Sequence, residues 1–437
     1  MKKRNVAILG AAGRDFHNFL MKYKDNLYYD VKFFTAEQIP GIEKRKFPKE
    51  LAGKLYKNDI PIYPEERLPE LIKKYDINDV VFSYSDISHI EVMHRASIAL
   101  ANGANFVLLG PKDTMIKSKK KIISVCAVRT GAGKSQTSRK IAEILKEHGK
   151  KVVAIRHPMP YSNLIKQKCQ RFAKYSDLEK NECTIEEREE YEPWINLEIP
   201  VYAGVDYNSI IREAEKEADI IIWDGGNNDL PFYWPDLHVV VVDPHRAGHE
   251  LLYHPGETNF RMADVIVINK IDSAPKEGIK KLKENIKKYN SKAIVIKAKS
   301  KIVVSDKGLL KNKKVVVIED GPTLTHGEMS FGAGYLVAKQ NKTKIISPKK
   351  YAVGSIKETY EKYKHMSEVL PAMGYSERQI KELELTINKT PADIVIDGSP
   401  FNLSRIVKVN KPIVSVEYFL QEIGLSLEDV LKRKGFV

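Results

Sequence analysis

The residues of this chain that are best suited to chemistry lie in the stretch 122–145, where an apolar run is followed by a glycine turn and then by a helical pattern. Gly131 and Gly133 leave room for backbone N–H groups to surround an anion, and the N-terminus of the following helix favours negative charge. At this spacing Lys134 contacts the β- and γ-phosphates of a nucleotide, and Ser135 holds Mg²⁺. Val128 stands where the usual motif carries its first glycine. We therefore predict a nucleotide-binding loop with an altered first position.

An acidic residue follows a second apolar run, 218–223, and two glycines come directly after it. A carboxylate in this place commonly binds Mg²⁺ opposite the loop serine, and the glycines allow a γ-phosphate to approach closely. We therefore expect Ser135 and Asp224 to be the Mg²⁺ ligands. Basic residues follow further apolar runs, where they can hold an acceptor or neutralise a transferring phosphate. The predicted catalytic residues are Lys134, Asp224, Arg246, Arg156 and His157.

The apolar run 263–268 is followed directly by a base-recognition signal, which consists of Asn269, Lys270 and Asp272. A carboxylate at the last of these positions accepts two hydrogen bonds from guanine, a pattern that adenine does not offer. We interpret 298–300 as a second base-contacting loop. These motifs favour GTP and leave ATP as the other nucleotide. The predicted nucleotide-binding residues are Arg129, Thr130, Gly131, Ala132, Gly133, Lys134, Ser135, Gln136, Asn269, Lys270 and Asp272.

Weaker patterns mark candidate substrate sites. The turn 10–15 follows the first apolar run, but it lacks the third glycine of a dinucleotide fingerprint, so it fits a bound phosphate, a phosphorylated metabolite or a structural turn. His245 and His249 are four residues apart, which fits either a divalent metal or hydrogen-bonded histidines. A hydroxyl-rich turn at 320–327 favours an anion. The substrate candidates are Gly10, Gly13, Arg14, Asp15, His245, His249, Thr325 and His326.

Apolar runs that alternate with helical patterns must position these residues. Near the start of the chain, strands are expected at 29–35, 79–84 and 105–109, with helices at 68–75 and 89–102. Such alternation is typical of a parallel sheet, so we predict an α/β fold.

We expect three domains, and the basic run KSKKK marks the first boundary. They are a Rossmann-like domain at 1–117, a phosphate-loop α/β domain at 118–342 and a small α/β extension at 343–437. Within the second domain, the segment 162–200 is polar, charged and weakly periodic. It is interpreted as a helical insertion, either a lid over the site or a solvated pair of helices.

The 437 residues carry a formal net charge of +15, and 43% of them are hydrophobic. Basic residues are scattered and no nucleic-acid motif is present, so small polyanionic ligands explain the surplus better than nucleic acid. No apolar run approaches the roughly 18 residues that span a bilayer, and the start of the chain lacks a signal-peptide core. We therefore expect a cytoplasmic location and no membrane partner. Abundant Lys and Glu with scarce Gln favour a thermophilic source.

The loop sequence VRTGAGKSQTSRK is similar to the phosphate loops of a dimeric P-loop class that includes dethiobiotin synthetases, metallochaperone GTPases and septum-site ATPases. In that class a signature Lys precedes the glycines. Arg129 stands at this position, and the resemblance implies a homodimer in which it reaches across the interface.

Over nearly its whole length the chain also resembles an archaeal and bacterial family of predicted GTPases labelled cyclic 2,3-diphosphoglycerate synthetase-like. The motifs that carry this resemblance include GAAGRDFHN, IRHPMPY, WDGGNND, VVDPHRAGHE, INKID and EDGPTLTHGEM. The resemblance implies that ATP activates a phosphate of the substrate and that an intramolecular phosphoanhydride then closes.

The leading hypothesis is an NTP- and Mg²⁺-dependent phosphotransferase or synthetase that acts on a small polyanionic metabolite. The alternative is a regulatory or metallochaperone-type GTPase switch in which the insertion 162–200 moves. A third interpretation makes the first domain a dinucleotide sensor that regulates the second. A phosphorylated product formed in step with NDP would favour the synthetase, whereas GTP turnover without a substrate would favour the switch.

Overall fold

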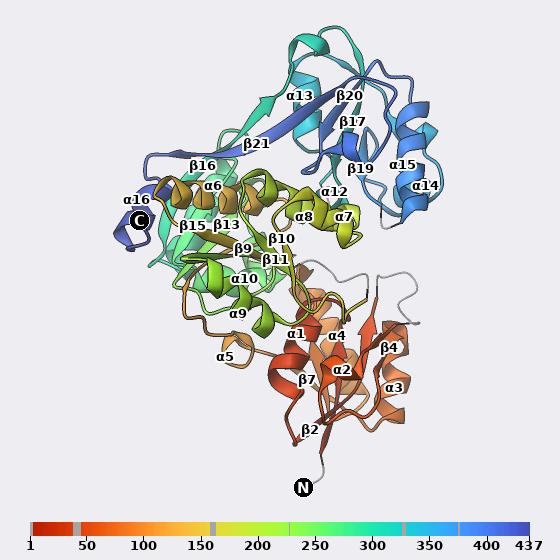
Figure 1. Cartoon of the computed structure of the whole chain (residues 1–437), viewed down its shortest axis with the longest axis vertical. Helices are drawn as coiled ribbons and strands as arrows, with labels where there is room; N and C mark the ends of the chain where they lie inside the picture. The colour runs from red at the N-terminus through yellow and green to blue at the C-terminus, as the bar shows by residue number, and fades with distance from the viewer. Residues whose placement is uncertain (1–2, 38–44, 158–162, 227, 326–328, 375) are drawn as a thin grey trace.

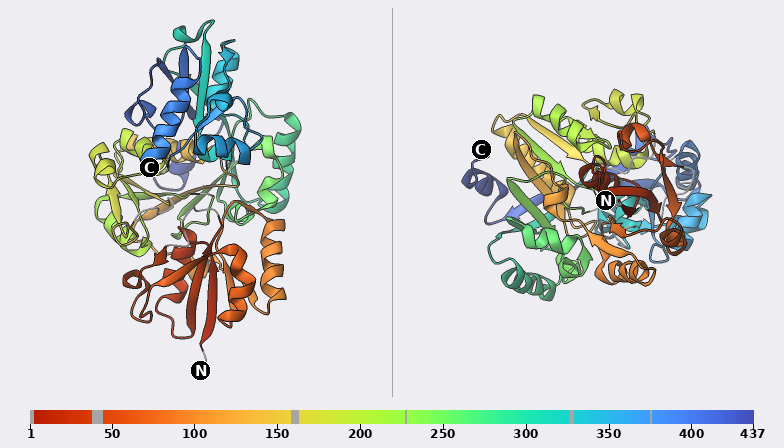
Figure 2. Two further views of the ribbon diagram at one scale, coloured as in Figure 1. Left: turned by 90° about the vertical axis from the view of Figure 1, so that its right-hand side faces the viewer. Right: turned by 90° about the horizontal axis from the view of Figure 1, so that it is seen from below.

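The computed structural model describes residues 3–37, 45–157, 163–226, 228–325, 329–374 and 376–437. Parallel strands alternate with helices through most of the chain, which confirms the predicted α/β fold class. Figures 1 and 2 show the N-terminal sheet at one end of the long axis, the phosphate-loop strands in the middle and the C-terminal strands at the other end. Among the described helices, none has both the length and the apolar character needed to cross a membrane.

The N-terminal sheet has six strands in the order β3-β4-β2-β1-β5-β7, and every pair except β3–β4 is parallel. Strand β1 pairs with β2 on one side and β5 on the other, so the strand order reverses at its carboxyl end, where Gly10 lies. The elements are β1 (Arg4–Leu9), α1 (Arg14–Asn18), β2 (Tyr29–Ala36), β3 (Lys46–Phe47), α2 (Lys49–Ala52), β4 (Ile60–Pro64), α3 (Leu68–Lys74), β5 (Asp79–Phe82), β6 (Ile87–Ser88), α4 (His89–Ala101), β7 (Asn105–Leu108) and α5 (Pro111–Thr114).

The second sheet runs β10-β11-β9-β12-β8-β13-β15-β16-β21-β20-β17-β18, and β19 also pairs with β17. From β11 to β16 all neighbours are parallel, so their carboxyl ends meet at one edge. The predicted catalytic residues lie at this edge. The elements of this part are β8 (Lys121–Ala127), α6 (Lys134–Glu147), β9 (Val152–Arg156), β11 (Val201–Ala203), α9 (Tyr207–Glu217), β12 (Ile220–Asp224), β13 (Leu237–Val242), β14 (Tyr253–His254), α10 (Gly256–Met262), β15 (Val265–Ile268), α11 (Lys276–Tyr289) and β16 (Ile294–Val304).

Residues 298–300 are not the base-contacting loop that the sequence suggested. They lie inside β16 and pair with 420–422 of the antiparallel strand β21 (Ile413–Ile423). The returning strand β21 extends the hydrogen-bond ladder past the point where the parallel sheet would end. A turn was expected there because the partner strand lies more than a hundred residues further along the chain.

The C-terminal strands and helices share an apolar cluster of their own. Residues 315–318 pack in this cluster, so the chain leaves the phosphate-loop core before the expected boundary at 342. We propose a boundary within the long pair β16–β21 instead, whereas the remaining domain limits stay predictions. The elements are β17 (Lys314–Asp320), α12 (Gly321–Thr325), α13 (Ala333–Gln340), β18 (Lys344–Ile345), α14 (Ser355–Lys362), β19 (Val369–Ala372), α15 (Glu377–Lys389) and β20 (Ile394–Gly398). The final helix α16 (Leu427–Arg433) packs back into the phosphate-loop core.

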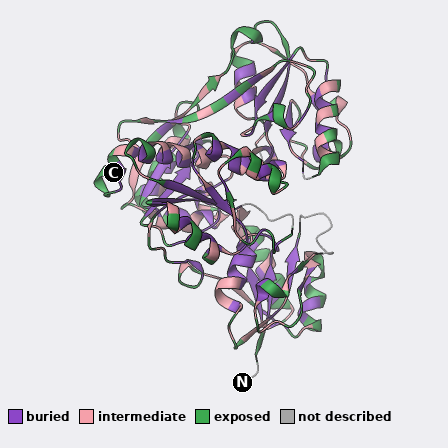
Figure 3. Cartoon of the chain, in the orientation of Figure 1, coloured by how far each residue is buried: buried purple, intermediate pink, exposed green. Residues whose placement is uncertain are grey.

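The predicted insertion contains β10 (Gln170–Phe172), α7 (Tyr175–Lys180) and α8 (Ile185–Asn196). Tyr191 and Trp194 of α8 are buried in the phosphate-loop core, and Ile185 is buried in the C-terminal core. Figure 3 shows that the buried residues are concentrated in the central strands of the sheets, against which such helices pack. Helix α8 therefore bridges two cores and is not a solvated helix on the surface.

Candidate nucleotide and substrate site

The phosphate loop joins β8 to α6 and takes its shape from two glycines. The φ angle is +79° at Gly131 and +112° at Gly133, in the region that favours glycine. A Cβ atom on Gly133 would lie 2.1 Å from Nδ2 of Asn269, so no side chain fits there. Asn269 Nδ2 also donates a hydrogen bond to the carbonyl of Ala132 at 3.0 Å. The first residue of the base-recognition motif therefore braces the loop.

Lys134 and Asp224, predicted from separate motifs, contact each other. Lys134 Nζ donates to Asp224 Oδ1 at 2.6 Å, and Ser138 Oγ donates to the same oxygen at 2.8 Å. Arg156 pairs with the other carboxylate oxygen of Asp224. The strand order explains this cluster, because β12 lies between β8 and β9. Three predicted catalytic residues thus come together, with Ser138 as a hydroxyl that the sequence interpretation did not single out.

The charges of this cluster are set by its burial. Burial alone would raise the pKa of Asp224, but Arg156 and Lys134 outweigh it and hold the pKa at about 2. Burial, together with the charge of Arg156, lowers the pKa of Lys134 to about 8 against the pull of Asp224. At neutral pH Asp224 is therefore a carboxylate, the form that binds Mg²⁺, and Lys134 is mostly charged.

Two further cations hold the loop through its carbonyl groups. Lys270 Nζ donates to the oxygen of Gly131 at 2.6 Å, and Arg246 Nη2 donates to the oxygen of Thr130 at 2.8 Å. Both cations pair with Asp243 Oδ2, at 3.1 Å and 3.2 Å respectively. Asp243 directly follows β13 and was not among the predicted site residues. Arg246 and Lys270 therefore lie at the loop, as the motifs required.

Asp272 is exposed in the turn that follows Lys270. The turn is tied to β16 by a hydrogen bond from the N–H of Ile271 to the carbonyl of Ala298, at 3.2 Å. The Asp272 carboxylate is accessible to solvent. It lies two residues after Lys270, which contacts the phosphate loop. The predicted contact between Asp272 and guanine stays a prediction.

The N-terminal sheet reaches the phosphate loop through Asp86. Asp86 Oδ1 lies 2.8 Å from Arg129 Nε. Its Oδ2 accepts hydrogen bonds from the N–H and the hydroxyl of Thr130, at 3.1 Å and 2.6 Å. The short antiparallel pair β6–β14 joins the two sheets beside this contact. The first two residues of the loop are therefore held by another part of the fold.

Arg129 is buried inside its own chain. Its guanidinium carbon lies 3.7 Å from the ring centre of Tyr253, and the side chain is 2% exposed. The resemblance to dimeric P-loop proteins instead placed this residue across an interface. In this fold Arg129 contacts Asp86 and Tyr253, so it shapes the loop from the same chain. The homodimer stays a prediction.

The glycine turn of the N-terminal sheet docks onto the phosphate-loop sheet. A Cβ atom on Gly13 would lie 1.6 Å from His157 Nε2, so the missing side chain allows the close approach. Arg14 Nε lies 3.5 Å from Asp229 Oδ1. Asp15 accepts two hydrogen bonds from backbone N–H groups of its own turn, at 2.6 Å and 2.7 Å. The predicted substrate residues of this turn therefore build a buried contact between sheets, which favours the structural interpretation of the turn.

His157 is neutral at neutral pH. Burial, with smaller contributions from the charges of Arg14 and Arg156, lowers its pKa to about 3. The ring lies beside Asp229, with 3.6 Å between Nδ1 and the nearest carboxylate oxygen. A neutral ring offers no charge to an anionic acceptor, so the predicted role of His157 in holding such an acceptor is not supported by its electrostatics.

His245 and His249 have different partners. His245 Nε2 lies 3.0 Å from the hydroxyl of Ser273, and His249 Nδ1 lies 3.2 Å from Arg129 Nη1. Gly248, with a φ of +110°, separates the two short helical turns that carry them, so they do not share a helix face. In the described part of the chain, no group of three or more His, Cys, Asp or Glu side chains is arranged to bind a metal.

The turn after β17 was predicted to bind an anion. Thr325 donates a hydrogen bond to the carbonyl of Gly321 at 2.9 Å, which is a contact within α12. Thr323 donates to Asp320 and lies against the phosphate loop, where its Cγ2 would be 3.4 Å from a Cβ atom on Gly131. His326 lies outside the described residues. The turn is therefore next to the phosphate loop, as a substrate-binding segment must be.

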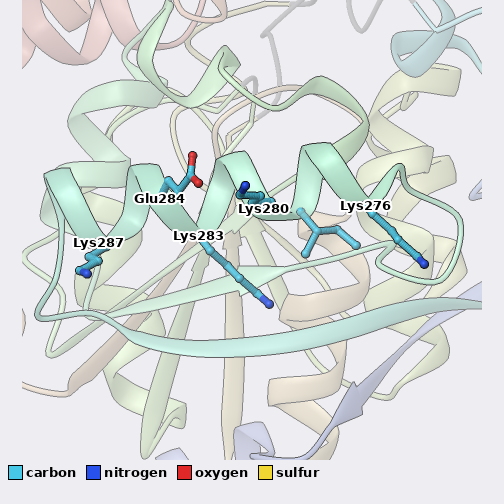
Figure 4. Close-up of a pocket in the computed structure, with 6 residues that line it drawn as sticks. Lys276, Lys280, Lys283, Glu284 and Lys287 are labelled. Carbon is cyan, nitrogen blue, oxygen red and sulfur yellow. The ribbon is translucent and has the colours of Figure 1, made fainter.

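Two hollows in the described part of the surface could each hold a small molecule. One, of about 440 Å³, lies along α11 (Figure 4). All its lining residues come from that single helix and none belongs to the predicted site; they are Lys276, Ile279, Lys280, Lys283, Glu284 and Lys287. This surface contributes to the net positive charge.

The second hollow, also of about 440 Å³, lies between the phosphate-loop helix and the C-terminal strands. Gln136 and Arg139 of α6 form one wall, and Asp397 and Tyr418 of β20 and β21 form the other. Gln136 belongs to the predicted nucleotide site. This hollow is therefore the candidate substrate cavity.

Comparison with known proteins agrees with a nucleotide-binding enzyme. Residues 224–297 match the family model of the CobW/HypB/UreG nucleotide-binding domain, a stretch that begins at Asp224 and includes the base-recognition motif. Two solved structures are weakly similar. LpxK from Aquifex aeolicus, in complex with ATP, is 13% identical with a TM-score of 0.46, covering 84% of this chain and 98% of that one.

The other solved structure is UDP-N-acetylmuramate:L-alanyl-gamma-D-glutamyl-meso-diaminopimelate ligase from Neisseria meningitides. It is 11% identical with a TM-score of 0.30, covering 68% of this chain and 81% of that one. At these TM-scores neither likeness shows a shared fold.

A curated relative gives a far closer match. The protein named arginine synthetase ArcE of Thermococcus kodakarensis is 62% identical over 433 residues, which cover 99% of this chain and 97% of the relative. That name differs from the cyclic 2,3-diphosphoglycerate synthetase label that the motifs suggested. The predicted enzyme with a P-loop nucleotide-binding domain is confirmed. The chain belongs to the family of the arginine synthetase ArcE.

Proposed function

We propose that this protein is an NTP-dependent synthetase whose product is arginine. The observation that carries the proposal is the 62% identity to arginine synthetase ArcE over 99% of the chain. The nucleotide site supports it, because Lys134 and Asp224 lie 2.6 Å apart at the start of the loop helix. A synthetase needs such a site to couple triphosphate cleavage to bond formation.

The chemistry follows from the product. Arginine differs from a ureido amino acid by one nitrogen in place of the ureido oxygen. That oxygen is a poor leaving group, so we propose that it first attacks the γ-phosphorus and expels NDP. A nitrogen nucleophile then adds to the activated carbon, the carbon–oxygen bond breaks, and the oxygen departs as part of phosphate. The added nitrogen loses a proton, which passes to the departing phosphate or to solvent.

The residues of the site divide this work between them. Lys134 contacts the β- and γ-phosphates and neutralises charge as the phosphoryl group moves. The carboxylate of Asp224 and the hydroxyl of Ser135 are oxygen donors of the kind that Mg²⁺ prefers, and they fit that ion. An ion held there would supply positive charge that stabilises the phosphate groups during transfer. Arg246 and Arg156 add positive charge beside the loop.

We propose GTP as the nucleotide, with ATP as the other candidate. Asn269 and Lys270 already brace the phosphate loop through Ala132 and Gly131. This arrangement leaves the carboxylate of Asp272, two residues on, exposed to receive a base. An aspartate there pairs with the N1–H and the amino group of guanine.

Formation of a cyclic phosphoanhydride from 2,3-diphosphoglycerate is the second candidate, because the motif resemblance covers nearly the whole chain. The cavity is lined by basic as well as acidic side chains, among them Arg139, Lys140, Asp397 and Glu417, a mixture that suits a zwitterionic amino acid better than a polyanion. A regulatory GTPase switch stays the alternative of another class.

A direct assay separates these candidates. The purified protein is incubated with MgGTP or MgATP, L-citrulline and ammonium, the pair obtained when one guanidinium nitrogen of arginine is replaced by oxygen. The proposal predicts arginine and NDP in equal amounts. Release of NDP without arginine would favour the switch, and a cyclic product from 2,3-diphosphoglycerate would favour the second candidate. Either result would overturn the proposal.

A further inference from the structure

Three acidic side chains from separate segments gather beside the candidate cavity. Glu189 comes from the middle of α8, Asp320 from the end of β17 and Asp397 from β20. Glu189 is 7% exposed and Asp397 is 4% exposed. Burial raises the pKa of Glu189 well above its ordinary value, and the charges of Asp320, Glu186 and Asp397 raise it further. Strands β17 and β20 are neighbours, with Ile318 opposite Asp397, so Asp320 and Asp397 lie at adjacent strand ends. The N–H of Asn402, in the turn after β20, donates a hydrogen bond to Glu192 of α8 at 3.1 Å, which brings that helix to the same edge.

The three groups differ in their hydrogen bonds. Asp320 accepts a hydrogen bond from Thr323, and Asp397 accepts two from the N–H and the hydroxyl of Ser399, at 3.0 Å and 2.6 Å. Glu189 Oε1 is buried and has no hydrogen-bond partner within the described chain. A buried carboxylate oxygen without a donor is costly, so its retention here indicates a donor supplied by a ligand.

This acidic group lies next to the reacting end of the nucleotide site. Thr323, which is bonded to Asp320, lies against Gly131 of the phosphate loop. Glu190 follows Glu189 on α8 and pairs with Arg156, which in turn pairs with Asp224. Helix α8 therefore passes close to Asp224 and the phosphate loop, and a molecule bound at Glu189 would lie on that helix, near the predicted position of the phosphoryl group.

The chemistry of the three carboxylates favours an organic cation over a metal ion. Among the described side chains, no group of three or more His, Cys, Asp or Glu is placed to hold a metal ion. A guanidinium presents five N–H donors in a planar fork and keeps its charge at every physiological pH. Carboxylates that approach from three different segments match donors that point in several directions.

We propose that Glu189, Asp320 and Asp397 form a subsite for the guanidinium group of arginine and for the ureido group from which it is made. This inference rests on the proposed function, since arginine is the product assigned there. The subsite places the carbon that exchanges oxygen for nitrogen beside the phosphate loop. Positive charge that develops as the guanidinium forms is then stabilised by the surrounding carboxylates.

Isothermal titration calorimetry tests the subsite. L-Arginine is titrated into the wild-type protein in the presence of MgGDP, and into the variants Glu189→Gln and Asp397→Asn. Because each variant loses a charge-assisted hydrogen bond, its affinity for arginine is expected to fall about tenfold or more. The affinity for MgGDP is expected to stay within about twofold, since neither side chain belongs to the nucleotide site.

Glu187→Gln is the matched control on the same helix. The Glu187 carboxylate is buried but already accepts hydrogen bonds from the N–H and the hydroxyl of Thr184 and from Gln167, at 2.8 Å, 3.2 Å and 3.0 Å. This variant is expected to lose stability and to keep the arginine affinity of the wild type. The comparison separates loss of a buried acid from loss of a ligand contact.

The outcomes distinguish the two proposals. If the wild-type protein binds no arginine, the proposed function fails and the subsite fails with it. If the wild type binds arginine and both variants bind it equally well, the subsite is wrong while the function stands. Circular dichroism confirms that each variant is folded, and a loss of arginine affinity in either folded variant supports the subsite. The preference for arginine over L-norleucine is expected to shrink in the same variants.

Discussion

Asp86 Oδ1 and Arg129 Nε lie 2.8 Å apart, so a residue in the segment that follows β5 of the N-terminal sheet holds the first residue of the phosphate loop. The same carboxylate accepts two hydrogen bonds from Thr130. Both partners are almost fully buried, so water does not screen the contact. The N-terminal sheet is therefore part of the nucleotide site, although no residue of the loop comes from it.

Replacing Asp86 with Ala is expected to weaken nucleotide binding by about tenfold, because the loop loses a buried charge-assisted contact. Fluorescence titration with a labelled nucleotide measures the change. Asp113→Ala serves as the control, since Asp113 forms a half-exposed pair with Lys22 at 2.7 Å and is expected to change binding by less than about twofold. Equal effects of the two variants would contradict the role assigned to Asp86.

Gly13→Ala is expected to loosen the contact between the N-terminal sheet and the phosphate-loop sheet. The added Cβ atom would lie 1.6 Å from His157 Nε2, so the free energy of unfolding should fall by about 1–3 kcal/mol. Gly110→Ala is the control, because nothing lies within 4 Å of a Cβ atom there. Chemical denaturation measures both. An unchanged stability of Gly13→Ala would show that the docking is not as described.

Asp272→Asn tests the choice of base. If the carboxylate binds guanine, the variant is expected to lose its preference for GTP and to gain activity with xanthosine triphosphate, whose ring offers the complementary acceptor. Steady-state kinetics with GTP, ATP and xanthosine triphosphate give the comparison. The same nucleotide profile in wild type and variant would refute the assignment of Asp272 and leave ATP as the nucleotide.

Removal of His157 should change the acid sensitivity of the protein. Its pKa is lowered to about 3 in the folded state, from an ordinary value of about 6.5. Between these values the unfolded chain binds a proton that the folded chain does not, so the histidine lowers stability as pH falls through this window. The charges that act on the ring come from Arg14, Arg156, Lys134 and Asp229.

The stability of the wild type relative to His157→Gln is therefore expected to decline from pH 6.5 towards pH 3. Denaturant unfolding at several pH values measures this difference. A difference that stays constant across the window would show that His157 is not buried as a neutral ring.

Local signals predicted much of the nucleotide site. The spacing of Gly131, Gly133 and Lys134 indicated the loop, and apolar runs that end in Asp224 or Asn269 indicated neighbouring strands. Parallel strands share one edge, so residues that follow them must meet. Shared strand ends therefore predict that Asp224 lies beside the phosphate loop, whereas its direct hydrogen bond with Lys134 was not predicted.

Contacts that depend on how separate sheets dock were not predictable in this way. Asp86 follows a strand end in the N-terminal sheet, which is a signal, but its partner Arg129 lies on another sheet. The acid Glu189 lies in a charged helix that looks solvated by periodicity alone. Its burial depends on α8 joining two cores. The placement of 298–300 within β16 likewise depends on the distant strand β21.

An oxygen-18 transfer experiment tests the central claim most directly. L-Citrulline labelled with oxygen-18 at the ureido oxygen is incubated with ammonium, MgGTP and the wild-type protein, and phosphate is analysed by mass spectrometry. The account predicts one oxygen-18 atom in each phosphate released, and no phosphate from Lys134→Ala. Phosphate whose fourth oxygen comes from water, with the label left in citrulline, would contradict phosphoryl transfer to the acceptor.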